Sequence, residues 1–152
     1  WKYMDALHEN IAQYTHSGSK PCNMAAQGEY VAGISFEYRG HVNKAKGAPI
    51  DLVFPKEGLG WDLEGVSIYK GTKHLDAAKK LVDWAVSKDA MQLYGKNFAV
   101  TAVPGMAQKL ENIPADYESR LIPLDFNKMA DARERVLGEW TKRYDAKSEA
   151  KK

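Results

Sequence analysis

The sequence predicts an α/β fold in which short buried strands alternate with helices. Two observations carry this prediction. Residues 74–87 place apolar side chains along one stripe of a helix and charged side chains away from it. Residues 49–55 alternate in polarity and are rich in branched side chains, which is typical of a strand. Because helices separate the strands along the chain, we expect at least part of the sheet to be parallel.

Local signals predict each of the other elements. Pro21 suits the first turn of a short helix, and Gly28 would close that helix in the left-handed conformation. Ser87 and Asp125 are predicted N-caps. The tail 147–152 is expected to fray. The predicted elements are helices at 3–14, 21–27, 40–47, 74–87, 88–96 and 126–146, strands at 29–36, 49–55 and 65–71, a loop at 56–65 and an extended segment at 97–105.

Composition excludes several classes of protein. With 152 residues, 44% hydrophobic and 28% charged, the chain is large enough for one domain with a core and is not disordered. A net charge of +2 is too small for a dedicated nucleic-acid surface. The single Cys22 forms no internal disulfide, and the apolar runs are too short to span a membrane. The chain starts at Trp1, and we interpret it as a processed or excised piece.

Polar side chains after two predicted strands and in one loop form the candidate ligand site. Ligands of α/β folds bind beyond the carboxyl ends of the strands. Hydroxyl groups and helix N-termini bind anions, whereas carboxylates and aromatic faces bind an ammonium group. The candidate ligand-binding residues are Ser17, Ser19, Ser35, Tyr38, Glu57, Trp61 and Asp62.

Each candidate also has a structural alternative. The two serines are common turn formers, Tyr38 could pack at a sheet edge, and 57–62 could be an ordinary surface loop. A hydrolase using Ser17 with His16 is a remote alternative, because adjacent residues of an extended chain point to opposite sides. The histidines have no metal-type spacing. We therefore predict no catalytic residue, no metal and no cofactor.

Several motifs resemble the periplasmic solute-binding proteins of bacterial ABC importers, in the ferric-ion-binding-like branch. The pattern A-x-x-L-x-D-W-x-x-S-x-x-A over residues 78–90 marks the wider class. Residues 53–85 and 133–149 are most similar to the 2-aminoethylphosphonate-binding proteins. The resemblance covers essentially the whole chain. It implies a periplasmic location, a non-enzymatic role in binding a small solute, an ABC permease as partner, and no nucleic acid.

The resemblance implies a type II periplasmic-binding-protein-like fold, with two α/β lobes around a ligand cleft. Such proteins are usually much longer, so we expect an incomplete version. Residues 1–65 and 106–152 would belong to the second lobe, and residues 66–105 to the first. Helix 74–87 and strand 65–71 would then lack their usual neighbours. Because exposed apolar faces and open strand edges pair with other chains, we expect a rearranged or swapped homodimer.

The resemblance also implies roles for individual residues. In the wider family a loop eleven residues before a Gly-Glu pair offers a polar side chain to a bound anion, and Ser17 occupies that place. Iron-binding relatives use two adjacent tyrosines, whereas Arg39 follows Tyr38 here, which leaves too few hard anionic ligands. The leading prediction is capture of 2-aminoethylphosphonate, and the alternatives are ferric ion or another anion or small solute. Its phosphonate would be held by Ser17, Ser35 and Tyr38, and its amine by Glu57, Trp61 or Asp62.

Overall fold

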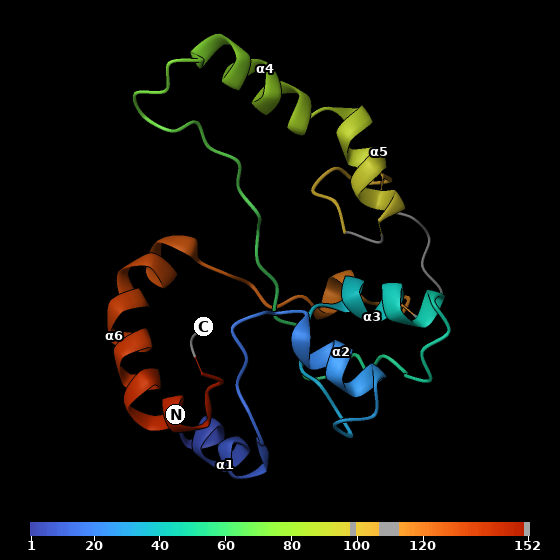
Figure 1. Cartoon of the computed structure of the whole chain (residues 1–152), viewed down its shortest axis with the longest axis vertical. Helices are drawn as coiled ribbons and strands as arrows, with labels where there is room; N and C mark the ends of the chain where they lie inside the picture. The colour runs from blue at the N-terminus through green and yellow to red at the C-terminus, as the bar shows by residue number, and fades with distance from the viewer. Residues whose placement is uncertain (98–99, 107–112, 151–152) are drawn as a thin grey trace.

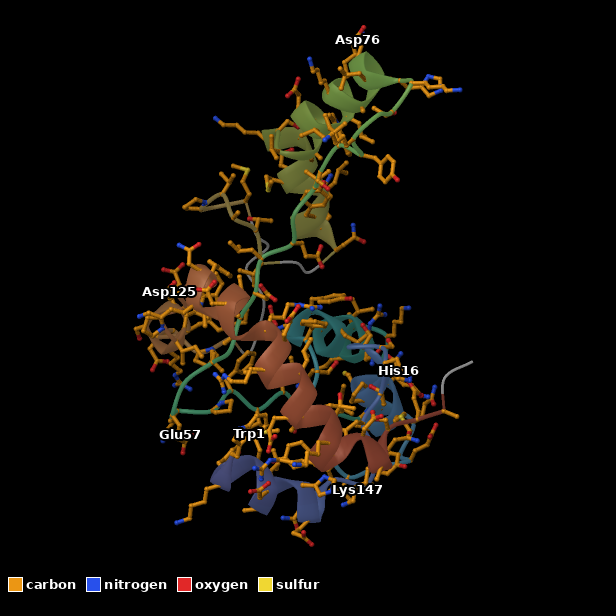
Figure 2. The ribbon with its side chains drawn as sticks, turned by 90° about the vertical axis from the view of Figure 1, so that its left-hand side faces the viewer. Trp1, His16, Glu57, Asp76, Asp125 and Lys147 are labelled. Carbon is orange, nitrogen blue, oxygen red and sulfur yellow. The ribbon has the colours of Figure 1, made fainter. Side chains whose placement is uncertain are left out.

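A computed structural model of the chain describes residues 1–97, 100–106 and 113–150, and its regular structure there is helical. Figure 1 shows the helices in two groups: α1, α2, α3 and α6 form a body, whereas α4 and α5 pack on each other at the end of a long run of chain. Figure 2, turned by 90°, shows the same separation. The helices are α1 (Lys2–Asn10), α2 (Lys20–Ala26), α3 (Glu37–Ala45), α4 (Leu75–Ala85), α5 (Lys88–Lys96), η1 (Glu118–Arg120), α6 (Phe126–Tyr144) and η2 (Asp145–Lys147).

The best-packed part of the body joins the beginning of the chain to its C-terminal helix, and we call it the terminal clasp (1–16 and 140–149). Its centre is Tyr144, whose side chain is only 1% exposed. The ring of Tyr144 lies 6.1 Å from that of Trp140, and Tyr14 meets the Trp140 ring edge-on at 5.1 Å. Aromatic pairs at these distances add to the free energy of burying the rings.

Polar contacts complete the terminal clasp. The hydroxyl of Tyr144 donates to Asp5 Oδ1 at 2.6 Å. Burial, together with the neighbouring Asp5 carboxylate, raises the pKa of Tyr144 to about 12, so the phenol remains a proton donor at neutral pH. The Lys147 ammonium donates to the carbonyls of His8 and Ile11 at 2.6 and 2.7 Å. Because those carbonyls lie at the C-terminal end of α1, Lys147 stabilises this helix end.

The clasp explains two differences from the sequence prediction. The first helix was predicted over 3–14 but ends at Asn10, since Tyr14 pairs with Ser148 in a parallel bridge instead of extending the helix. The tail was predicted to fray, which is wrong for residues 147–149, because Lys147 and Glu149 bond to the segment 14–16. Residues 151–152 lie outside the described part of the chain.

Other helix predictions are confirmed with small shifts. Asp125 caps α6 by accepting from the amide of Lys128, and Ser87 caps α5 by accepting from the amide of Ala90. Gly28 follows α2 with a φ of 77°, as the left-handed closure required. The helix predicted at 40–47 corresponds to α3, which begins three residues earlier at Glu37 and ends two residues earlier at Ala45.

The predicted strands at 29–36, 49–55 and 65–71 are wrong for this chain on its own. Within the described ranges the only β pairing consists of two isolated bridges, Tyr14–Ser148 and Leu59–Leu121. A strand needs a neighbouring backbone, and none of the described segments lies in register beside these three. Their side chains stay exposed, for example Val31, Val53 and Tyr69. The predicted extended segment 97–105 falls partly on residues 98–99, outside the described residues.

The exposed surface measures how open the chain is. Its accessible area is 12108 Å², whereas a compact monomer of 17.0 kDa would expose about 7,700 Å². The apolar stripe of α4 contributes, because Leu81 is 61% and Trp84 46% exposed. Trp84 is therefore not packed in a core within this chain, whereas Trp140 packs in the terminal clasp.

Candidate functional site

The loop before α2 presents the first two candidate hydroxyl groups, those of Ser17 and Ser19. The carbonyl of Ser17 accepts from the hydroxyl of Thr15 at 2.8 Å and from the amide of Lys20 at 3.2 Å. Ser19 is the residue before α2, and its carbonyl accepts from the amide of Asn23. These backbone bonds turn the loop into the helix and leave the Ser17 side chain exposed.

The segment 33–38 lies directly against this loop. The hydroxyl of Ser35 donates to the carbonyl of Gly18 at 2.5 Å, and the hydroxyls of Ser19 and Tyr38 lie 3.2 Å apart. The fold therefore brings Ser19, Ser35 and Tyr38 together around the loop that carries Ser17. We call these four residues the hydroxyl cluster.

A glycine in the loop and one in the segment make this approach possible. A Cβ atom on Gly18 would collide with the ring of Phe36, and one on Gly33 would collide with the carbonyl oxygen of Pro21. Neither position has room for a side chain, so the two segments can touch only because both residues are glycine. The Phe36 ring also stacks on that of Tyr38, with centroids 6.1 Å apart.

Helix α3 gives the cluster a different geometry from the predicted one. Sequence reasoning placed residues 35–38 at the end of a strand, but Phe36 is the extended residue before α3, and Glu37 and Tyr38 form its first turn. In this turn the amide of Arg39 donates to the carbonyl of Phe36 at 3.2 Å. The amides of Glu37 and Tyr38 precede the hydrogen bonds of the helix and lie at the positive end of its dipole. An anion at the hydroxyl cluster would gain from both.

Sequence reasoning considered Arg39 as the residue that breaks a tyrosine pair and as a possible partner of Glu37, but not as part of the site. Its guanidinium carbon lies 5.5 Å from the centroid of the Tyr38 ring, so a permanent positive charge adjoins the cluster. Its Nε atom is buried without a hydrogen-bond partner in the part of the chain that the structure describes. The sequence feature that could have pointed to Arg39 is its position directly after Tyr38, a candidate ligand-binding residue.

The structure does not bring Glu57, Trp61 and Asp62 to the hydroxyl cluster. Figure 2 shows Glu57 and His16 at opposite sides of the molecule. The Trp61 indole donates to the carbonyl of Ile122 at 2.7 Å and meets the Phe126 ring edge-on. The carboxylate of Asp62 accepts from the next backbone amide at 2.8 Å. The segment 57–62 is thus joined to 120–126, and Trp61 has a packing role there.

The candidates do not lie at the two hollows described on the surface. Two hollows of about 490 and 310 Å³ lie elsewhere, lined by residues 113–119 and by residues of α2, α3 and the segment 46–48. None of the seven candidates lines either hollow. In the described ranges, His, Cys, Asp and Glu side chains form no group of three suited to a metal ion. None of the helices described is long and apolar enough to cross a membrane.

Comparison with known proteins establishes the class to which the chain belongs. Residues 1–119 match the family described as bacterial extracellular solute-binding protein, and the chain is a member of that family. These are binding proteins and not enzymes, and their location is periplasmic. The resemblance to solute-binding proteins is therefore confirmed at the level of the family.

Individual relatives show which kinds of binding protein the chain is similar to. The structure of the periplasmic binding protein AfuA from Actinobacillus pleuropneumoniae, with exogenous fructose-6-phosphate bound, superposes with a TM-score of 0.76 at 37% identity, over 95% of this chain and 46% of AfuA. The spermidine/putrescine-binding periplasmic protein of Escherichia coli is 25% identical over 88% of this chain and 36% of its own length.

A Haemophilus influenzae protein of uncharacterized function is 45% identical over 62% of this chain and 27% of its own length. The chain thus spans less than half the length of each of these three relatives.

Proposed function

We propose that this chain is the ligand-contacting part of a solute-binding protein that captures a small phosphonate, with 2-aminoethylphosphonate as the candidate ligand, and delivers it to an ABC permease. The observation that carries the proposal is the hydroxyl cluster, where the loop 17–19 and the segment 35–38 are joined by two hydrogen bonds. One links Ser35 to Gly18, and the other links Ser19 to Tyr38. Family membership supports the binding role, and the cluster supports the chemistry of the ligand.

A phosphonate group suits the donors of the cluster. It carries up to two negative charges and three acceptor oxygens, so it needs several convergent donors. The Ser35 hydroxyl, a predicted donor, is used on the Gly18 carbonyl, and Ser19 and Tyr38 share one hydrogen bond. Ser17 and the acceptor of the Ser19–Tyr38 pair can therefore supply two hydroxyl donors, and the first turn of α3 adds backbone amides. Arg39 adds a positive charge at 5.5 Å from the Tyr38 ring. The carboxylate of Glu37 lies in the same first turn of α3, and Arg39, two residues later, carries the opposite charge.

A sugar phosphate is the second candidate ligand. AfuA, 37% identical to this chain, has fructose-6-phosphate bound in its solved structure. A phosphate ester offers the same tetrahedral group of oxygens as a phosphonate, so the hydroxyl cluster would suit both. The two ligands differ at the other end, where the phosphonate has an ammonium group and the sugar has hydroxyl groups.

The amine end of the ligand would be met by a different segment from the phosphonate end. With the Trp61 indole bonded to Ile122, the carboxylates of Glu57 and Asp62 remain as its candidate partners. They lie away from the hydroxyl cluster within the same proposed lobe, so lobe closure alone would not bring them together, and contact with the amine would need the loop 56–65 to move within that lobe. A ferric ion is a poorer ligand than either phosphorus compound, because Tyr38 has a cationic neighbour where iron binders have a second phenol.

We also propose the division into lobes that the resemblance implies, with 66–105 in the first lobe and 1–65 with 106–152 in the second. The separation of the α4–α5 pair from the body in both views supports this division. The remainder of the first lobe would then cover the exposed stripe of α4 and supply a neighbouring strand for the segment 65–71.

Calorimetry on the protein at its full natural length tests the proposed function. We expect it to bind 2-aminoethylphosphonate or fructose 6-phosphate, and Tyr38→Phe to weaken that binding about fivefold, since a hydrogen bond is worth about 1 kcal/mol. The control is Tyr69→Phe, which removes the same hydroxyl group from an exposed tyrosine far along the chain. Binding of putrescine alone, or of ferric ion alone, would contradict the proposal.

A further inference from the structure

The C-terminal segment 145–149 lies beside the residues that lead into the ligand loop. The amide of Tyr14 donates to the carbonyl of Lys147, and the amide of Glu149 donates to the carbonyl of Tyr14, both at 2.9 Å. Ser148 and Tyr14 thereby form a parallel bridge. The chain just before Ser17 is thus held by a segment more than a hundred residues away in sequence.

The side chain of Glu149 continues this contact to both ends of the loop. Its Oε1 accepts from the backbone amide of His16 at 2.7 Å, and its Oε2 forms an ion pair with the ammonium of Lys20. The imidazole Nε2 of His16 lies 3.1 Å from the backbone carbonyl of Glu149. His16 directly precedes the Ser17–Ser19 loop and Lys20 directly follows it, so one carboxylate bridges the two ends.

The carboxylate is well suited to this role. Its side chain is only 16% exposed, which limits the competition from water. The Lys20 ammonium and the His16 amide hold the pKa of Glu149 below its ordinary value, so the group is ionised at neutral pH. The pairing also offsets its negative charge beside a loop that we expect to receive an anion.

We propose that Glu149 is a positioning residue that fixes the Ser17–Ser19 loop, and with it the hydroxyl groups offered to the ligand, by bridging His16 and Lys20. The part that concerns the ligand rests on the proposed function. Ordering a loop costs conformational entropy, and a loop that is ordered before the ligand arrives leaves less of this cost to binding.

Charge and positioning predict opposite effects when Glu149 is replaced. If only charge mattered, removing the carboxylate would leave Lys20 positive and would strengthen the binding of an anion. If positioning matters, Glu149→Ala releases the loop and weakens binding. Glu149→Gln keeps an oxygen that can accept from the His16 amide, so this variant should recover part of the loss.

The test measures loop order and affinity separately. Amide hydrogen exchange of residues 14–20 and of α4–α5 is followed in the wild-type chain, Glu149→Ala and Glu149→Gln. We expect exchange in 14–20 to accelerate about tenfold in Glu149→Ala with no change in α4–α5, because the loop then opens more often while the rest of the chain does not. The matched control is Glu139→Ala, which removes an α6 carboxylate paired with Arg143 and should leave the loop unchanged.

Affinity is measured at full natural length with 2-aminoethylphosphonate and with fructose 6-phosphate as probes. We expect the dissociation constant of the bound probe to rise about tenfold in Glu149→Ala, and less in Glu149→Gln. Unchanged exchange in 14–20 would overturn the proposal, as would tighter or unchanged binding despite faster exchange. If exchange in α4–α5 accelerated as much as in 14–20, the substitution would have lowered the stability of the whole chain, and the positioning role would be rejected. If the wild type binds neither probe, the proposed function fails, and hydrogen exchange still decides whether Glu149 fixes the loop.

Discussion

The terminal clasp and the α4–α5 pair have similar kinds of residues but opposite surroundings. Both contain an apolar helix face with a tryptophan, Trp140 on α6 and Trp84 on α4. Trp140 packs against Tyr14 and Tyr144, whereas Trp84 is 46% exposed. The clasp finds its partners within this chain, and the α4–α5 pair does not. A helix thus forms from local signals in both places, but a core forms only where the second surface is present.

The largest expected effect tests this contrast with the same substitution in both regions. Trp140→Ala should lower the free energy of unfolding by about 2–4 kcal/mol, because it opens a cavity among packed rings. Trp84→Ala should change it by less than about 0.5 kcal/mol, as is usual for exposed positions. Urea denaturation followed by circular dichroism measures both. Equal losses would mean that α4 is packed in solution and would contradict the comparison.

The exposed face of the α4–α5 pair should also control self-association. We propose that isolated copies of the chain cover their apolar surfaces on one another, forming a rearranged or swapped dimer. Tyr69 is 85% and Leu81 61% exposed, so Tyr69→Lys with Leu81→Lys should shift the chain to monomer without altering its helicity. Sedimentation velocity over a range of concentrations measures this shift. A wild-type chain that stays monomeric throughout would remove the dimer proposal.

The smallest expected effect concerns acid, which should loosen the clasp before the α4–α5 pair. The Tyr144 hydroxyl and the Arg143 guanidinium hold the pKa of Asp5 below its ordinary value, as Lys20 and the His16 amide do for Glu149. A carboxyl with a lowered pKa stabilises the fold fully above its ordinary pKa of about 4 and loses that contribution as pH falls through the lowered value.

Hydrogen exchange between pH 7 and pH 3 should therefore show α1 and residues 14–16 losing protection below about pH 4, with α4 unaffected. In Glu149→Gln the segment 14–16 should lose this pH dependence, while α1 keeps it through Asp5. Simultaneous loss of protection in both regions would show that acid acts on the whole chain and not on these two carboxylates.

Local features of the fold were accessible from the sequence, and distant ones were not. Asp125, Ser87 and Gly28 act through atoms within a few residues, so their patterns predicted helix ends correctly. The start of α3 was missed because Phe36 carries no capping side chain. The alternation in 49–55 predicts the shape of a strand but cannot provide its neighbour.

The candidate site divides in the same way. The hydroxyl residues at 17–19 and 35–38 were singled out from their chemistry, and the fold joins them through Gly18 and Gly33, whose roles emerge only from the close approach of two backbones. Glu149 was assigned to a frayed tail, because its partners His16 and Lys20 lie far away in sequence and no local pattern predicts these contacts. The position of 57–62 depends on Ile122 and Arg120, which likewise lie far along the chain.

The clasp has a consequence for the order of events during synthesis. The bond between Tyr144 and Asp5 joins residues 139 positions apart, and that between Glu149 and His16 joins residues 133 positions apart. Contacts of such high sequence separation close late and slow the search for the native state. While a ribosome is still translating the stretch around residue 140, α1 lacks the Tyr144 side chain to which Asp5 bonds in the folded chain. The terminal clasp is therefore completed only after the rest of the described body has been made.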